Sequence, residues 1–335
     1  MKKNRLSFLK YVFFLGLGIF LVWWSLHQIP ADKWGEFKDS LANAHYWLII
    51  PVLFILGGSH VLRSLRWKIL MEPMGYKPSL VNTFFAVMIG YLANLAVPRL
   101  GEVLKCTILA RYEKVPAEKL VGTIVAERAF DVISLGIVFL LALVLQFDVV
   151  ANYAYQMLAD LFKNKSGHLS YQKIIIFFSI LIVIAIAVKV WFKQFSHLQI
   201  VIAIKKILRG IWEGLTSIRF LKQKGTFIFY TIGIWFLYIA GTWVGLYATQ
   251  GTEGLGLSTA ISALAFASIG MIITPGGIGA YAFFLAKVLE RNGIDFEIGY
   301  ANGTLQWFAQ FLIVVLVGFI SMGLLPWFNK KKIVH

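Results

Sequence analysis

The chain has 335 residues, of which 59% are hydrophobic and 14% charged, whereas a soluble globular domain carries roughly 25% charged residues. Its apolar residues fall in runs of about 18 to 25, the length at which a helix spans a bilayer. This composition excludes a soluble protein and predicts an all-α polytopic membrane protein, with residues 1–335 forming one integral membrane domain.

The net charge of +16 does not indicate a nucleic-acid partner, because the basic residues lie in the short connections between apolar runs. That placement is the positive-inside pattern of membrane proteins. Cys106 is the only cysteine, so the chain has no internal disulfide framework and no cysteine-based metal site. The six histidines show no metal-ligand spacing. We therefore expect no metal and no cofactor.

Apolar runs and the charges between them predict six to eight membrane spans. The full-length runs are residues 11–26, 46–62, 129–147, 174–191, 226–247 and 305–325. Lysines before the first run and after the last predict that both termini are cytoplasmic. The same rule predicts a cytoplasmic location for the basic run from Arg63 to Lys68 and for the connection 193–224, which holds an amphipathic segment at 200–208. We expect a multi-pass protein of the cell (inner or plasma) membrane.

Two apolar segments are too short to span a bilayer fully. Residues 81–97 are interrupted by Gly90 and Asn94 and are followed by a charged stretch, 99–119. If both flanks are cytoplasmic, this is a re-entrant segment, which requires cover by protein or water. Residues 260–274 and 275–289 are either two short helices or one re-entrant hairpin. Paired, interrupted segments in the two halves of a chain indicate a transport site.

Ionisable residues within the apolar run near residue 130 have two possible depths. Glu127 and Asp131 are four apart and share a helix face, with Arg128 also within reach of Asp131. If the helix enters the membrane at Leu120, Asp131 lies roughly 16 Å deep, where a charge must be paired or hydrated. If it enters nearer Glu127, all three residues are interfacial.

Polar residues at the breaks in these segments are candidates for binding a lipid headgroup, and each has a structural alternative. Arginines bind phosphate with two parallel bonds, or anchor a helix at the interface, as Trp67 also can. An amide can bind a headgroup or satisfy broken backbone, and a glycine turn can form an anion-binding nest or simply break a helix. The candidates are Arg63, Arg66, Asn94, Arg99, Glu102, Glu127, Arg128, Asp131, Pro275, Gly276, Gly277 and Gly279.

Five short motifs carry a resemblance to a known family. They are Arg63-x-x-Arg66-Trp67, Gly90-x-x-x-Asn94, Pro98-Arg99-x-Gly101-Glu102, Glu127-Arg128-x-x-Asp131 and Pro275-Gly-Gly-Ile-Gly279. In this order they resemble the flippase-like transmembrane domain of lysylphosphatidylglycerol synthases, which also occurs as a free-standing membrane protein. Many members carry Glu near Ala282 and Arg near Gln306, so these two departures leave the substrate open.

The resemblance implies a protein that moves lipid. In the fused synthases a soluble domain transfers the amino acid, whereas this chain ends at His335, soon after the last apolar run. We therefore expect translocation of a phosphate-bearing lipid, a phospholipid or a polyprenyl phosphate, bound through Arg99, Arg128 and Arg66. The sequence has no nucleophile elbow, P-loop or ATPase motif, and we assign no catalytic residue.

Two alternatives to translocation stay open. One is a membrane enzyme or accessory subunit that modifies a lipid headgroup, as in lysylphosphatidylglycerol or cell-envelope glycolipid synthesis, with Glu127 or Asp131 as the base. The other is a scaffold that assists a separate synthase without transport. A homo-oligomer and a synthase partner are both compatible with the sequence.

Overall fold

The computed structural model describes residues 19–97, 99–147 and 220–330, with a few isolated positions outside these ranges. Within them the chain forms helices and turns and no strand, which confirms the all-α class. The predicted span 174–191, most of the connection 193–224 with its amphipathic segment, and Pro98 lie outside the described residues. Of the predicted first span, 11–26, residue 16 and residues 19–26 are described and helical.

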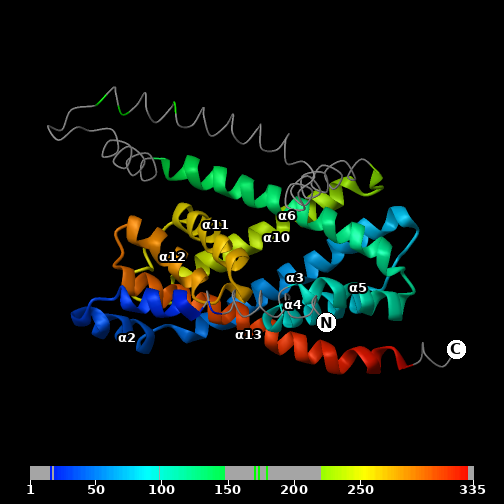
Figure 1. The fold of residues 1–335 in the computed structure, drawn as a ribbon, viewed down its shortest axis with the longest axis horizontal. Helices are drawn as coiled ribbons and strands as arrows, with labels where there is room; N and C mark the ends of the chain where they lie inside the picture. The colour runs from blue at the N-terminus through cyan, green and yellow to red at the C-terminus, as the bar shows by residue number, and fades with distance from the viewer. Residues whose placement is uncertain are drawn as a thin grey trace.

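In the described part of the chain, four long apolar helices run along the length of the molecule (Figure 1). They are α3 (Ile49–Met71), α6 (Ala117–Leu145), α10 (Lys224–Leu246) and α13 (Phe296–Phe328). Each is long and apolar enough to cross a membrane. Three are clearly longer than predicted: α3 continues past residue 62, α6 starts before residue 129, and α13 starts before residue 305. Charged residues that the sequence placed outside the spans therefore lie within them.

The predicted re-entrant segment 81–97 is the first arm of a helical hairpin. Helix α4 (Leu80–Ala96) packs against α5 (Leu100–Glu113), so the charged stretch 99–119 is largely a second helix. The arms lie so close that a Cβ on Gly101 would be 2.0 Å from the carbonyl oxygen of Gly90. At 1.5 Å per residue the arms are about 25 and 21 Å long, less than the roughly 30 Å of a hydrocarbon core.

Residues 257–291 form a second hairpin. Helix α11 (Leu257–Ile273) is followed by the short 3₁₀ turn η5 (Pro275–Gly277) and by α12 (Ala280–Arg291), which packs back on α11. The packing is close, because a Cβ on Gly270 would be 2.6 Å from the backbone nitrogen of Tyr281. The sequence left open whether this segment is two short helices or one hairpin. The structure has two short helices that pack side by side as a hairpin.

The two hairpins enter from opposite ends of the bundle, and their tips meet (Figure 1). The open end of the first is tied to the C-terminal end of α13 by hydrogen bonds between Asn82 and Asn329. The open end of the second lies before the start of α13, where Gln146 donates to Asn292. Between them, a Cβ on Gly276 would be 2.8 Å from Leu95. The tips of the two hairpins are therefore in contact near the centre of the bundle.

Short elements complete the two ends of the bundle. At the end where α13 begins, η1 (Ala31–Lys33), α2 (Trp34–Ala42) and η2 (Tyr46–Leu48) lead into α3, and Phe37 of α2 packs on Tyr300. At the other end, η3 (Glu72–Met74) follows α3. We call these the Asn292 end and the Asn329 end.

The positive-inside pattern predicts that the Asn329 end faces the cytoplasm. In a Cys106→Ala background, a cysteine at Gly254, in the exposed α10–α11 connection, should react with a membrane-impermeant maleimide on intact cells. A cysteine at Glu118, exposed in the first turn of α6, should react only after permeabilisation. The reverse labelling pattern would invert the topology.

Candidate functional site

A buried ion-pair network joins α3, α5 and α6. Glu127 is fully buried and accepts hydrogen bonds from Arg63 Nη1 at 3.0 Å and Lys105 Nζ at 2.8 Å. Asp131, one turn further along α6, accepts from Arg63 Nη1 at 2.7 Å and Arg66 Nη2 at 2.6 Å. The expected shared face of Glu127 and Asp131 is present, and it binds cations from two other helices.

The network lies at mid-length of its helix. Asp131 is fourteen residues from Ala117 and fourteen from Leu145, or about 21 Å from either end of α6. This position favours the deeper of the two placements left open by the sequence. Charges at such depth persist when they pair with one another or face water.

The sequence had placed the arginines Arg63 and Arg66 in a connection after the span. In the structure both lie within α3. The side chains of Arg63 and Arg66 are 7% and 0% exposed and point to α6. Trp67 is also fully buried; its indole donates to Thr123 Oγ1 at 2.8 Å, and the Lys105 ammonium lies 4.6 Å from its ring centroid. Trp67 is thus a core residue rather than an interface anchor. Hydropathy ends the span at residue 62 because it counts each charge without its partner.

Arg128 is held more loosely than the other cations. Its guanidinium lies 3.5 Å from Glu102 and 3.6 Å from Asp131, and its side chain is 42% exposed. The predicted reach from Arg128 to Asp131 is therefore present. Glu102 pairs with Arg128 and not with Arg99, which is exposed at the start of α5 with a left-handed φ of 68°.

A cavity of about 380 Å³ lies between the long helices beside the hairpin tips. One part of its wall is polar and includes Arg63, Arg128 and Tyr238, whose hydroxyl accepts a hydrogen bond from Arg63 Nη2 at 3.1 Å. The remaining polar residues of the wall are His60, Tyr91, Asn94, Thr242, Ser268, Tyr281, Gln306 and Gln310. Leucine, isoleucine, valine, methionine and phenylalanine side chains form the rest. The cavity is amphipathic, with arginine on its polar side.

Both hairpin tips contribute to the cavity wall. Asn94 lines it, while its Oδ1 accepts from the Gly101 amide at 2.7 Å, so this side chain satisfies backbone as one alternative expected. Gly276 also lines it, and its carbonyl accepts from Trp307 Nε1 at 2.7 Å.

The glycine turn at the second tip has left-handed backbone but no complete anion nest. Gly276, Gly277 and Gly279 have φ of 62°, 75° and 70°. The Gly277 amide already donates to the Thr274 carbonyl at 3.1 Å, and Pro275 and Gly277 are buried. The turn therefore sets the hairpin geometry and exposes Gly276 to the cavity.

The two departures from the family pattern are neutral in the structure. Gln306 lines the cavity and donates to Asn302 Oδ1 at 2.8 Å, and Asn302 in turn donates to the Gly245 carbonyl at 2.9 Å. Ala282 is buried against α13, because a Cβ on Gly303 would be 2.7 Å from its Cα. These positions add no charge to the site.

Several residues of the site were not among the candidates from the sequence; they include His60, Tyr91, Lys105 and Tyr238. Three of these four have a helical-spacing signal. His60 is three residues before Arg63, Tyr91 is three before Asn94, and Lys105 is three after Glu102. Tyr238 has none, because its apolar span contains no charged residue to mark a polar face.

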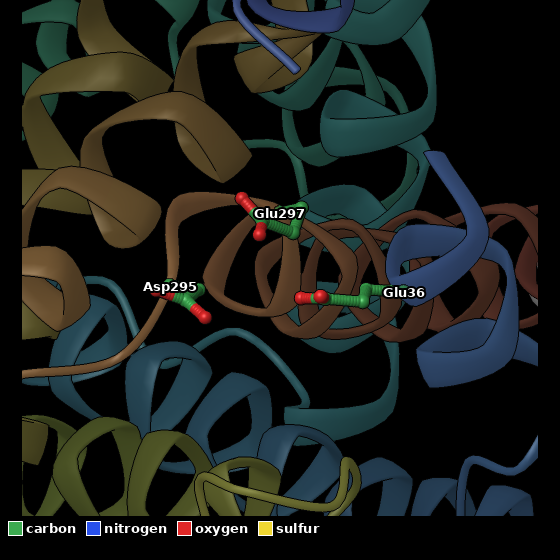
Figure 2. Close-up of side chains that lie close together, drawn as sticks. All are labelled: Glu36, Asp295 and Glu297. Carbon is green, nitrogen blue, oxygen red and sulfur yellow. The ribbon is translucent and has the colours of Figure 1, made fainter. Parts of the chain in front are cut away.

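A second group of acids, Glu36, Asp295 and Glu297, has carboxylate oxygens within 4.8 Å of one another (Figure 2). The Lys33 ammonium pairs with all three, at 2.9 Å, 3.4 Å and 3.3 Å. Lys33 therefore supplies the cation, and the group fastens η1 and α2 to the start of α13.

Comparison with known proteins identifies the family. The family model described as "Lysylphosphatidylglycerol synthase TM region" matches residues 8–318. A UPF0104 membrane protein of Methanocaldococcus jannaschii is 23% identical over 311 residues, which is 87% of this chain and 88% of that protein. No solved structure matches the chain. This chain is a multi-pass membrane protein that belongs to the lysylphosphatidylglycerol synthase TM region family.

Proposed function

We propose that this protein binds a phosphate-bearing membrane lipid in the cavity beside the hairpin tips and moves it between the leaflets. The observation that carries the proposal is the cavity itself, which is amphipathic and presents Arg63 and Arg128 at mid-length of the long helices. A guanidinium matches the geometry of a phosphate. Apolar walls match lipid chains.

The barrier to lipid movement is the transfer of a charged headgroup through hydrocarbon. A buried ion is strongly disfavoured unless it is paired and hydrogen-bonded. Arg63 and Arg128, with hydroxyl and amide groups around them, offer such pairing halfway along the bundle. The hairpins approach this point from opposite ends, and both tips contribute to the cavity wall. Helices interrupted at a central site are a common basis of alternating access.

The direct test is leaflet exchange in liposomes. Purified protein reconstituted with fluorescent phosphatidylglycerol should raise the fraction of label that external dithionite quenches. The enzyme alternative is tested on the same preparation, by supplying aminoacyl-tRNA or a sugar nucleotide. Exchange at the protein-free rate would contradict translocation, and steady formation of a modified lipid would favour the enzyme.

Filling the cavity should stop transport without disturbing the ion pairs. Ser268 lies on α11 in the cavity wall and is partly buried. Ser268→Trp should reduce exchange to the protein-free rate, because the indole takes space that the headgroup needs. Ser258→Trp is the control, since Ser258 lies in the first turn of the same helix and not among the cavity-lining residues. Equal exchange by folded Ser268→Trp and wild type would place the lipid path elsewhere.

A further inference from the structure

We infer that the cavity selects lipids with a net negative headgroup over lipids with a cationic, aminoacylated headgroup, and that Arg128 is the selecting residue. The inference rests on the proposed function and specifies its substrate class. It further assigns Glu102 as an internal competitor, a carboxylate that occupies Arg128 until a phosphate replaces it.

The first support is the direction in which the charged network faces. Among the described residues that line the cavity, Arg63 and Arg128 are the only ones of the types Lys, Arg, Asp and Glu. The carboxylates that balance them lie behind this wall, with Glu127 at 0% and Asp131 at 14% side-chain exposure. A ligand in the cavity therefore meets guanidinium groups and neutral hydrogen-bonding groups before it meets an acid.

The second support is the charge balance of the network. It contains four cations, Arg63, Arg66, Lys105 and Arg128, and three carboxylates, Glu102, Glu127 and Asp131. One positive charge is thus left over in a weakly screening environment. A phosphodiester with an uncharged substituent brings the compensating charge. A lysyl-type headgroup, with two amines and one phosphate, adds a second excess positive charge instead.

The third support is the difference between the two arginines. Arg63 is fixed, because Nη1 bonds two carboxylates at 2.7 and 3.0 Å and Nη2 bonds Tyr238 at 3.1 Å. The contacts of Arg128, 3.5 and 3.6 Å, are longer than the roughly 2.7–2.9 Å of a charge-assisted hydrogen bond. Arg128 can therefore exchange partners where Arg63 cannot.

Glu102 determines what that exchange must displace. Its side chain is 29% exposed, so it can be hydrated once it releases Arg128. A phosphate offers Arg128 the same kind of acceptor as this carboxylate, and the two compete for one guanidinium. Neutralising Arg128 and neutralising Glu102 should therefore change anion transport in opposite directions.

The experiment compares headgroups in liposomes containing the purified full chain. The fluorescent probes are phosphatidylglycerol, a phosphate monoester lipid, phosphatidylethanolamine and lysyl-phosphatidylglycerol. We expect the wild type to exchange the two anionic lipids at least about tenfold faster than the cationic one, because phosphatidylglycerol and lysyl-phosphatidylglycerol differ by two charges near the site. The two anionic probes also distinguish a phosphodiester from a monoester substrate.

The variants test the assigned residues. Arg128→Gln should slow anionic lipid and reduce the anionic-to-cationic ratio, whereas Glu102→Gln should accelerate anionic lipid and raise that ratio. Arg111→Gln and Glu118→Gln are matched controls, since both residues are exposed and lie on the same two helices, α5 and α6. Neither control should change the ratio.

The outcomes separate the inference from the proposed function. Equal or faster exchange of lysyl-phosphatidylglycerol by the wild type overturns the inference and leaves translocation standing. Loss of rate in both variants with an unchanged ratio also overturns it, since the pair would then be structural. Exchange of none of the four lipids overturns the proposed function and the inference with it. The wild-type headgroup ratio decides the matter even if a variant fails to fold.

Discussion

Glu127→Gln should yield little folded protein. Glu127 is fully buried. Its carboxylate lies 2.8 Å from Lys105 Nζ and 3.0 Å from Arg63 Nη1. A neutral amide leaves Lys105 uncompensated and leaves Arg63 with Asp131 alone, and breaking a buried pair in this way costs roughly 3 to 5 kcal/mol. The total free energy of unfolding of a folded protein is only about 5 to 15 kcal/mol. The measurement is the monodisperse fraction on gel filtration in mild detergent, together with the midpoint of thermal unfolding.

The matched control is Glu118→Gln, the same substitution in the first turn of the same helix, where the side chain is exposed. Its yield and unfolding midpoint should equal those of the wild type. The double variant Glu127→Gln/Lys105→Met should recover part of the lost stability, because it removes one of the stranded charges and residues in one network are coupled. Wild-type stability of the single variant would show that Glu127 is hydrated rather than buried.

Gly101→Ala should prevent the first hairpin from closing. A Cβ at this position would be 2.0 Å from the Gly90 carbonyl oxygen and 2.7 Å from the Asn94 side-chain carbon. The first obstacle is backbone, so a rotamer change cannot relieve it, and the two arms must separate. Overpacking costs about 1 to 3 kcal/mol, and more where the surroundings are rigid. Separation would also displace Lys105 from Glu127, so both the unfolding midpoint and lipid exchange should fall sharply.

Gly122→Ala and Gly136→Ala provide the comparison. Both glycines lie within α6, and a Cβ at either position would have no atom within 4 Å. Because alanine is the better helix former by about 1 kcal/mol, these variants should be as stable as the wild type or slightly more stable. A Gly101→Ala protein as stable as these two would show that α4 and α5 do not approach as closely as the structure has them.

Arg128→Gln should affect stability far less than Glu127→Gln. Arg128 is 42% exposed, with contacts of 3.5 and 3.6 Å, and exposed pairs of this kind are worth about 0 to 1 kcal/mol. The structure separates residues that hold the helices together from a residue free to contact a ligand.

The sequence by itself determined the class of the protein. Long apolar runs, a low share of charged residues and five motifs were enough for the all-α polytopic fold and the family. They also located the breaks near Asn94 and Pro275, because proline, glycine and amide residues interrupt an apolar run visibly. Helical spacing was enough to place Glu127, Arg128 and Asp131 close together, since residues three and four apart share a face.

Only the tertiary structure decided where the charged residues lie and what they contact. Hydropathy treats each charge as a cost, so it ended one span before Arg63 and began another after Glu127. The actual helices continue because Arg63 and Glu127, sixty-four positions apart in the chain, neutralise each other within the bundle. Likewise, no local signal shows that 99–119 folds back on α4, or that the tips at Leu95 and Gly276 meet. These features depend on contacts between segments that are far apart in the sequence, and the periodicity of hydrophobic residues carries only local information.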